Sequence, residues 1–275
     1  MMERVWERLR AWGVAAQSMF ETESSFIVFG VRGNLPVVLK VLRRPGDEWL
    51  SGEVLEAFDG QGTVRVYEQV AGAVLLEMLE PGTQLASMAL TGQDAEATEI
   101  LAGVIEEMSR AGASSGTFVT VEDWGKAFEW YLSSGDKSIP ADLVREAGEL
   151  YLSLCSSQKE ARLLHGDLQH YNVLFDSRRG WIAIDPKGVV GEVEYEIGAA
   201  LRNPCERPEL FVSPEAIERR IRCFEKRLGL DAERALCWAF SQAVLSAIWG
   251  VEDGFEVDAG NPSLLLADSI RQLLR

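Results

Sequence analysis

Residues 163–187 constrain this chain more than any other stretch, because they set two carboxylates and an amide around a predicted β-hairpin. The stretch reads Leu-Leu-His-Gly-Asp-Leu-Gln-His-Tyr-Asn-Val-Leu-Phe-Asp and, after a polar turn, ends Gly-Trp-Ile-Ala-Ile-Asp-Pro-Lys. Residues 173–175 and 181–184 have the pattern of two short strands joined by that turn. Such a hairpin brings Asn172, just before its first strand, beside Asp185, just after its second.

The side chains at these positions have the chemistry that phosphoryl transfer requires. Moving a γ-phosphoryl group needs charge neutralisation and positioning more than covalent help. Asp167 precedes Asn172 on the same loop and is the predicted base for the proton of an acceptor hydroxyl. Asn172 and Asp185 carry the oxygen atoms that Mg²⁺ prefers, so they are the predicted metal ligands.

A lysine interrupts an apolar strand pattern upstream. Lys40 lies within Val-Val-Leu-Lys-Val-Leu at 37–42, and a buried ammonium group needs a partner. The predicted partner is Glu53, on a helix expected over 47–58, with Glu56 about one turn away as the alternative. An edge-strand lysine that opposes aggregation is the other interpretation of this residue.

The motif resembles the kinase pattern in which Asp is followed by four residues and Asn, with Gly after His where protein kinases have Arg. That replacement resembles the aminoglycoside phosphotransferases. The continuations Ile-Asp-Pro-Lys-Gly at 184–188, Gly-Glu at 191–192 and Leu-Arg-Asn-Pro at 201–204 resemble the aminoglycoside and hydroxyurea antibiotic resistance kinases, related to streptomycin 6-phosphotransferase. The resemblance runs from about Phe26 to Asn203. It implies an α+β, two-lobed protein-kinase-like fold, with a small β-rich lobe and a larger, mostly helical lobe.

The resemblance also implies how ATP and Mg²⁺ are held. Lys40, paired with Glu53, grips the α- and β-phosphates in such kinases. No Gly-x-Gly-x-x-Gly precedes the lysine, and Ser24 and Ser25 are the predicted phosphate contacts instead. The adenine edge is expected to meet backbone groups shortly before the break between the lobes, at Glu77, Met78 and Leu79.

The sequence Glu80-Pro81-Gly82 predicts that break. Residues 1–80 are the expected nucleotide-binding lobe, and residues 81–275 are the expected catalytic and acceptor-binding lobe. Upstream, a helix is predicted over 2–12 and strands over 25–31, 37–42, 63–67 and 71–79. Downstream, helical spacing dominates, over 93–111, 121–133, 141–156, 214–228, 231–249 and 262–274.

Composition excludes several classes of partner. The formal net charge of -16 argues against nucleic acid and anionic membranes, which need basic surfaces. The same charge would attract a cationic acceptor, although a plain acidic surface explains it as well. Four scattered cysteines suggest neither a zinc site nor a disulfide framework: Cys155, Cys205, Cys223 and Cys237. No apolar run reaches the length of a membrane span, so a cytoplasmic protein is expected.

Other polar residues have less specific predictions. His165 is interpreted as a structural brace of the catalytic loop, and His170 as a surface or substrate-facing residue. Binding of ammonium or guanidinium groups is one interpretation of the acidic residues downstream, and solvated loops are the commoner one. These acidic residues are Glu192, Glu194, Glu196 and the run at 252–258.

The sequence therefore predicts transfer of the γ-phosphoryl group of ATP to a hydroxyl group of a small molecule. By resemblance, that acceptor is an aminoglycoside, streptomycin-like, or hydroxyurea. Two alternatives remain open: a kinase of a metabolite such as a sugar, a fructosamine-type adduct or an amino alcohol, and a nucleotide-binding pseudokinase. Protein-kinase activity is disfavoured because the chain has no Asp-Phe-Gly and no Ala-Pro-Glu segment.

Overall fold

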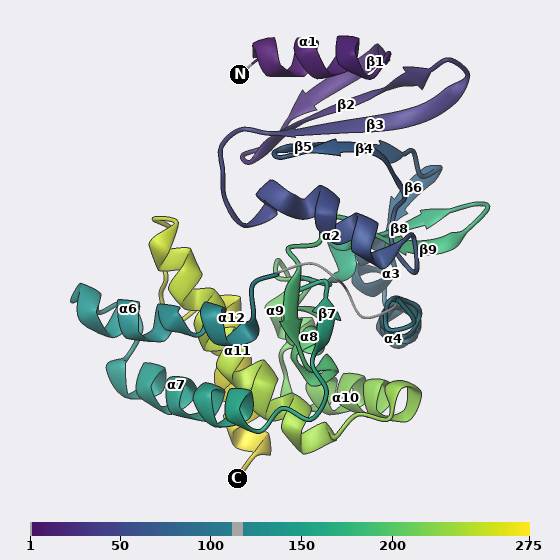
Figure 1. Ribbon diagram of the computed structural model, residues 1–275. Coiled ribbons are helices and arrows are strands. Elements are labelled where there is room, and N and C mark those ends of the chain that lie inside the picture. The colour runs from purple at the N-terminus through teal and green to yellow at the C-terminus, as the bar shows by residue number, and fades with distance from the viewer. Residues whose placement is uncertain (1, 112–117) are drawn as a thin grey trace. The chain divides into compact units, whose positions relative to one another are not determined.

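A computed structural model describes residues 2–111 and 118–275 of the chain (Figure 1). The chain forms two compact units. The first comprises residues 1–84, 104–116 and 172–188, and the second comprises residues 85–103, 117–171 and 189–275. The break predicted after residue 80 lies close to the end of the first segment, but the first unit also takes in two later segments. One of these is the predicted hairpin.

The first unit contains a five-stranded antiparallel sheet with the order β1-β2-β3-β5-β4. Its strands are β1 (Ala15–Glu21), β2 (Ser25–Arg32), β3 (Leu35–Leu42), β4 (Val66–Val70) and β5 (Ala73–Glu77). Three of the four predicted strands are confirmed, and the one expected over 63–67 begins later. The edge strand β1 is exposed along its whole length, so its sequence carries no alternation that would predict it.

The two faces of this sheet pack against different helices, which Figure 1 shows on opposite sides. Val5 and Leu9 of α1 (Met2–Ala11) pack in one core cluster with Leu39 of β3. Leu55 of α2 (Ser51–Phe58) packs in a second cluster with Val38. Because side chains alternate along a strand, Lys40 shares a face with Val38. A 3₁₀ turn, η1 (Asp47–Leu50), precedes α2.

The predicted hairpin is present and forms β8 (Val173–Asp176) and β9 (Gly180–Ala183). A third strand, β6 (Pro81–Gln84), pairs with β8 in the same small sheet. The Pro-Gly sequence that predicted a break therefore begins a short strand as well. Asp176 stabilises the junction, because its Oδ2 accepts a hydrogen bond of 3.0 Å from the backbone N–H of Glu80.

Helices dominate the rest of the chain. They are α3 (Ala86–Leu90), α4 (Asp94–Met108), α5 (Val121–Trp124), α6 (Lys126–Ser134), α7 (Ala141–Ser156), α8 (Val193–Arg202), α9 (Pro208–Phe211), α10 (Pro214–Leu228), α11 (Ala232–Glu252) and α12 (Pro262–Leu273). The bounds of α7 and α10 match the prediction, and the helix predicted over 121–133 is divided at Gly125. A two-stranded ladder of β7 (Arg162–Leu164) with β10 (Val189–Gly191) and the turn η2 (His170–Asn172) flank the catalytic motif.

Helix α11 forms the centre of the second unit. Its Trp238 is fully buried, and its ring packs edge-on against Tyr151 of α7 and Tyr195 of α8, with centroids 5.1 and 5.2 Å away. Among the described residues, α11 alone is long and apolar enough to cross a membrane, contrary to the sequence expectation. About 61% of its most apolar window is buried inside the protein. A core helix meets the same length and composition test, so this is weak evidence for a span.

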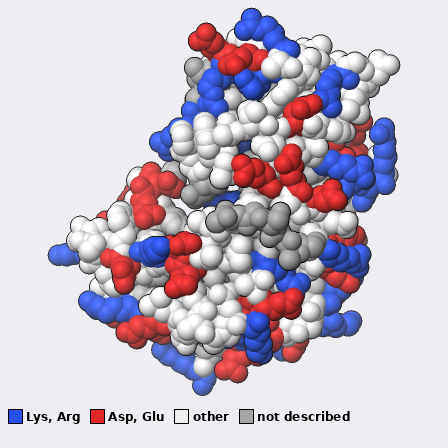
Figure 2. Space-filling model, in the orientation of Figure 1, with Lys and Arg blue, Asp and Glu red and all other residues white. Residues whose placement is uncertain are grey.

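Charge is not segregated on the face drawn in Figure 2. Acidic and basic side chains are interspersed there, with no single-sign field covering it. The net charge of -16 is a property of the whole chain and does not mark an acceptor site on this face.

Candidate active site

Lys40 is the centre of the polar site in the first unit. Only 5% of the residue is exposed, and its Nζ lies 2.7 Å from Glu48 Oε2 and 2.9 Å from Asp185 Oδ1. Burial acts to lower the pKa of Lys40, but the two carboxylates outweigh it and raise the pKa above the ordinary value. The lysine is therefore a cation at neutral pH, held between two anions.

The predicted partner of Lys40 is wrong. Glu53 and Glu56 are both exposed on α2, and Glu56 accepts a hydrogen bond from Gln69 instead. Glu48 takes their place from the 3₁₀ turn η1. The sequence pattern treats 47–58 as one continuous helix, whereas a 3₁₀ turn has three residues per turn and changes which side chain faces the sheet.

The β8–β9 hairpin brings the two predicted metal ligands close along the backbone. The N–H of Ile184 donates a hydrogen bond of 2.8 Å to the carbonyl oxygen of Asn172, and Asp185 follows directly. Asp185 has a φ of +58°, the left-handed region that few non-glycine residues adopt. Strain of this kind concentrates at functional sites.

The chemistry of this donor pair fits Mg²⁺. An amide oxygen and a carboxylate are hard ligands, and Mg²⁺ is usually held by one or two protein groups together with phosphates and water. Among the described residues, no group of three or more His, Cys, Asp or Glu side chains could hold a metal ion. A site at Asn172 and Asp185 therefore needs oxygen atoms from a phosphorylated ligand, as a nucleotide would supply.

A pocket of about 630 Å³ in the first unit opens beside Lys40 and Asp185. This volume suits a small ligand. Its walls are largely apolar and include Ile27, Val38 and Leu174. Five of the six predicted nucleotide contacts line it: Ser24, Ser25, Lys40, Glu77 and Leu79. Met78 does not line it.

The local contacts refine the predictions for three of these residues. Ser25 is buried, and its Oγ lies 2.9 Å from the Oγ1 of Thr22, so its hydroxyl already serves the β1–β2 turn. Ser24 is exposed. The carboxylate of Glu77 pairs with Arg179 in the β8–β9 turn and accepts a 2.9 Å hydrogen bond from the backbone of Arg65. The side chain of Glu77 therefore has a structural role, and its backbone N–H also donates a 3.0 Å hydrogen bond to the carbonyl oxygen of Arg65.

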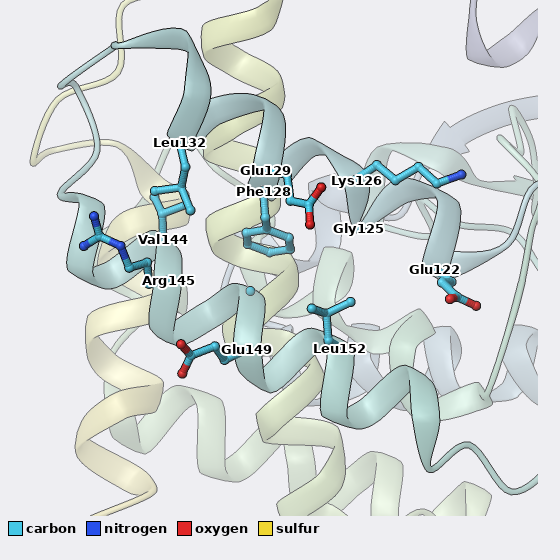
Figure 3. Close-up of a pocket in the computed structure, with 11 residues that line it drawn as sticks. Glu122, Gly125, Lys126, Phe128, Glu129, Leu132, Val144, Arg145, Glu149 and Leu152 are labelled. Carbon is cyan, nitrogen blue, oxygen red and sulfur yellow. The ribbon is translucent and has the colours of Figure 1, made fainter.

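A second hollow, of about 400 Å³, lies between α6 and α7 in the second unit (Figure 3). Phe128, Leu132 and Leu152 provide apolar walls, with Glu129 and Glu149 beside them. None of the residues predicted for catalysis lines this hollow. We therefore do not assign the active site to it.

The catalytic loop, which we define as residues 165–171, belongs to the second unit, and Glu196 of α8 holds its backbone. The Glu196 carboxylate accepts hydrogen bonds from the backbone N–H groups of His165, at 2.6 Å, and Gly166, at 3.1 Å. Burial raises the pKa of Glu196 to about 7, although these N–H donors act to lower it. Glu196 thus ties α8 to the two residues that precede Asp167.

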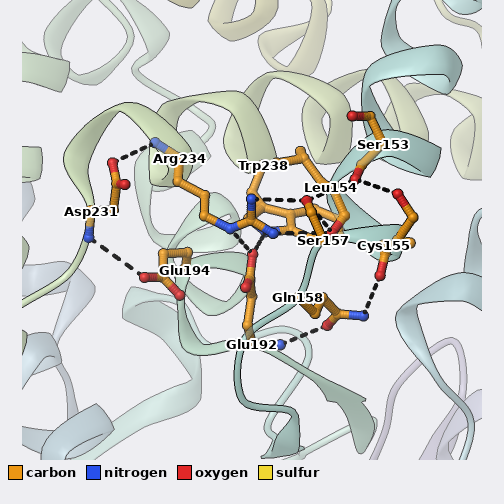
Figure 4. A network of polar contacts seen from close by, with 11 residues as sticks. Ser153, Leu154, Cys155, Ser157, Gln158, Glu192, Glu194, Asp231, Arg234 and Trp238 are labelled. Atoms are coloured by element: carbon orange, nitrogen blue, oxygen red, sulfur yellow. Dashed lines mark hydrogen bonds and ion pairs between the residues drawn. The ribbon is translucent and has the colours of Figure 1, made fainter.

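The interpretation of residues 192–196 as acceptor ligands or a solvated loop is wrong for Glu192 and Glu196, because both carboxylates are buried. Glu192 accepts hydrogen bonds from the guanidinium group of Arg234 and the indole N–H of Trp238 (Figure 4). Arg234 also donates to the carbonyl oxygen of Leu154, at 3.0 Å. This network ties the end of α7 and the start of α8 to α11.

The two histidines of the loop are both fully buried. The Nδ1 of His165 accepts a 3.3 Å hydrogen bond from the backbone N–H of Asp167, which suits the predicted brace. His170 is neither on the surface nor facing a substrate, so that prediction is wrong. Neither of its ring nitrogens has a hydrogen-bond partner in the part of the chain that the structure describes. Burial and the charge of Arg220 lower the pKa of His170 well below its ordinary value.

Asp167 has a cationic neighbour that the sequence reasoning missed. The Nη2 of Arg202, at the end of α8, lies 3.9 Å from Asp167 Oδ1, and the two side chains are 16% and 30% exposed. Arg202 belongs to the Leu-Arg-Asn-Pro sequence at 201–204, which carried the resemblance but no assigned role. Nearby, the hydroxyl of Tyr171 donates to the carboxylate of Glu206.

Comparisons with known proteins agree with this chemistry. The family model described as "Aminoglycoside/hydroxyurea antibiotic resistance kinase" matches residues 11–254. A streptomycin 3''-kinase of Klebsiella pneumoniae is 34% identical over 86% of this chain and 88% of its own length. A hydroxyurea phosphotransferase of Kitasatospora aureofaciens is 31% identical over 91% of this chain and 73% of its own length. The crystal structure of aminoglycoside phosphotransferase APH(4)-Ia superposes with a TM-score of 0.71 at 17% identity, covering 98% of this chain and 99% of that one. The predicted kinase-like α+β fold is thereby confirmed.

Proposed function

Because the chain belongs to the aminoglycoside/hydroxyurea antibiotic resistance kinase family, we propose that it transfers the γ-phosphoryl group of ATP to a hydroxyl group of a cationic antibiotic. The observation that carries this proposal is the cluster of Lys40, Glu48 and Asp185 in the lining of a ligand-sized pocket. A buried cation held by two carboxylates can exchange one of them for phosphate oxygens without leaving its position.

In this proposal the first unit binds the nucleotide. The adenine and ribose occupy the apolar pocket, and Lys40 holds the phosphates while Glu48 keeps the ammonium group oriented. Asn172 and Asp185 would hold Mg²⁺, which neutralises charge on the phosphates when it is bound. The pairing of Lys40 with Asp185 keeps that carboxylate at the site.

The second unit supplies the base. Asp167 accepts or orients the proton of the acceptor hydroxyl, and Arg202 lies beside its carboxylate. The buried Glu196 fixes the backbone of the two preceding residues, so the position of Asp167 is set before substrate arrives. Such positioning is a large part of what catalysis of phosphoryl transfer requires.

The proposed acceptor is streptomycin, since a relative with that named activity covers most of this chain. Hydroxyurea is the second candidate, because a phosphotransferase named for it is nearly as similar. The two differ in charge, which makes them separable by experiment. We propose that this activity takes place in the cytoplasm, where ATP is available.

The test is release of ADP from Mg·ATP by purified protein, with streptomycin, other aminoglycosides and hydroxyurea offered separately. Asp167→Asn removes the base, and Asp268→Asn, an exposed carboxylate on α12, is the matched control. Streptomycin-dependent turnover that is lost only in Asp167→Asn supports the proposal. Turnover with hydroxyurea alone transfers the assignment to the second candidate, and no turnover with any of these acceptors contradicts both.

A further inference from the structure

We propose that Trp124 and Trp249 form an aromatic surface beside the catalytic loop that receives a guanidinium or ammonium group of the acceptor. The inference rests on the proposed function and adds the residues that recognise the charge of the substrate. It concerns the second unit only, where both tryptophans and Asp167 lie.

The first tryptophan lies directly against the catalytic loop. Gly166, which precedes Asp167, has a φ of +82°, and a Cβ at that position would be 2.8 Å from Cη2 of Trp124. Only glycine permits this approach of an indole ring to the backbone. A molecule in contact with the exposed part of Trp124 is therefore one ring away from Gly166, the residue that precedes the proposed base.

The second tryptophan extends the surface. The rings of Trp124 and Trp249 meet edge to face, with centroids 5.3 Å apart and planes at 87°. Both residues are only half-buried, although Trp238 on the same helix as Trp249 is fully buried. Two large aromatic side chains thus remain partly open to solvent, and the first of them lies against the loop.

The end of α11 adds negative charge to this surface. Trp249, Glu252 and Asp253 are spaced i, i+3 and i+4, so they share one face of the helix. The last turn of α11 contains no basic residue, and Asp253 is its exposed C-terminal cap. The C-terminus of a helix also carries partial negative charge, so this end of α11 favours a cation.

Indole faces and carboxylates together select one kind of ligand. A guanidinium plane stacks on an indole ring and is attracted by its quadrupole. The adjacent carboxylates add charge-assisted hydrogen bonds. A neutral acceptor such as hydroxyurea gains neither interaction, so the surface distinguishes the two acceptors of the proposed function.

The experiment measures binding and turnover separately. Titration calorimetry gives the Kd for streptomycin, which bears guanidinium groups, without ATP, and steady-state kinetics gives KM and kcat for streptomycin and hydroxyurea. The variants are Trp249→Ala, Trp249→Phe and Asp253→Asn. Trp130→Ala is the control, since Trp130 is a 43% exposed tryptophan on α6 outside this surface. An unchanged Kd for Mg·ATP shows that each variant is folded.

We expect Trp249→Ala to raise the Kd and KM for streptomycin about tenfold, which corresponds to ~1.4 kcal/mol. Trp249→Phe should have a smaller effect, Asp253→Asn an effect in the same direction, and Trp130→Ala none. Kinetic constants for hydroxyurea should not change. If streptomycin binds without turnover and Trp249→Ala weakens that binding, the inference holds while the proposed reaction fails. Equal Kd values in wild type, Trp249→Ala and Asp253→Asn overturn the inference even if turnover persists, and so does a wild-type protein that does not bind streptomycin.

Discussion

At the scale of single residues, the contact that matters most for the proposed activity is the one between Lys40 and Glu48. A buried ammonium group without its carboxylate would lose a charge-assisted hydrogen bond worth about 1.5–3 kcal/mol. If Glu48 keeps Lys40 oriented toward phosphate, Glu48→Gln should lower kcat/KM for ATP about tenfold or more, since ~1.4 kcal/mol is a factor of ten in rate. Glu53→Gln, a change of the same type on the exposed face of α2, should have no effect.

Initial rates of ADP release against ATP concentration measure both variants. Comparable losses in Glu48→Gln and Glu53→Gln would show that the pairing seen here does not operate during catalysis. The result also separates the partner given by the structure from the partner predicted by sequence.

A second residue makes stability depend on pH. The pKa of Glu196 is raised to about 7 in the folded protein, against an ordinary value of 4.5. Between these values the folded state binds more protons than the unfolded state, so this residue's contribution to the free energy of unfolding falls as pH rises from about 4.5 to about 7. The loss is complete above pH 7 and is of the order of 3 kcal/mol.

Glu196→Gln cannot ionise and should remove this part of the pH dependence. The glutamine NH2 group cannot accept a hydrogen bond, so one of the N–H groups of His165 and Gly166 loses its acceptor. This loss should cost about 1–3 kcal/mol in stability. Thermal unfolding of both proteins at intervals from pH 5 to pH 7.5 gives the comparison. Parallel curves of Tm against pH for wild type and variant would rule out Glu196 as the titrating group.

At the scale of elements, the Glu192 network is what joins three helices of the second unit. Removing the carboxylate leaves the guanidinium group of Arg234 and the indole N–H of Trp238 without their buried acceptor. Breaking one side of a buried ion pair costs about 3–5 kcal/mol. Glu192→Leu should therefore lower the free energy of unfolding by about that amount.

Glu194→Leu is the matched control, two residues later and only half-buried, and should cost less than about 1 kcal/mol. Urea denaturation followed by tryptophan fluorescence measures both. Equal destabilisation would mean that the start of α8, rather than the network, is the sensitive feature.

Elements with a strong local signal were predictable, and those fixed by distant contacts were not. The β8–β9 hairpin and the helices α7 and α10 have clear periodicity and turn residues, and their predicted positions agree with the structure. The strands β7 and β10 have three residues each and exist because they pair with each other across the motif. Helix α8 was not predicted, because its carboxylates suggested a solvated loop. In the structure, hydrogen bonds from the backbone of 165–166 and from the side chain of Arg234 offset the cost of burying these carboxylates.

The candidate site shows the same division between local and distant causes. Lys40, Asn172 and Asp185 follow from residue type and local spacing. Glu48, Glu196 and Arg202 do not. Glu48 lies 8 positions from its partner, Glu196 lies 30 and 31 positions from its two partners, and Arg202 lies 35 positions from Asp167. A single sequence does not specify which side chains folding will bring together.

At the scale of the whole molecule, the proposed binding of nucleotide and metal belongs to one unit and the proposed base to the other, and this division is testable. The residues assigned to nucleotide and metal, Lys40, Asn172 and Asp185, all belong to the first unit, whereas Asp167 belongs to the second. Asp185→Asn should therefore weaken Mg²⁺-dependent binding of a fluorescent ATP analogue about tenfold or more, because a neutral amide is a poorer ligand for a hard cation. Asp167→Asn should bind the analogue like the wild type and lose most phosphoryl transfer, by about 10²-fold or more, because only the proton acceptor is removed. Fluorescence titrations with and without Mg²⁺, paired with single-turnover transfer, measure the two properties independently. If Asp167→Asn lost nucleotide affinity to the same extent as Asp185→Asn, while circular dichroism showed both variants folded, the two units would not act as separate binding and catalytic parts.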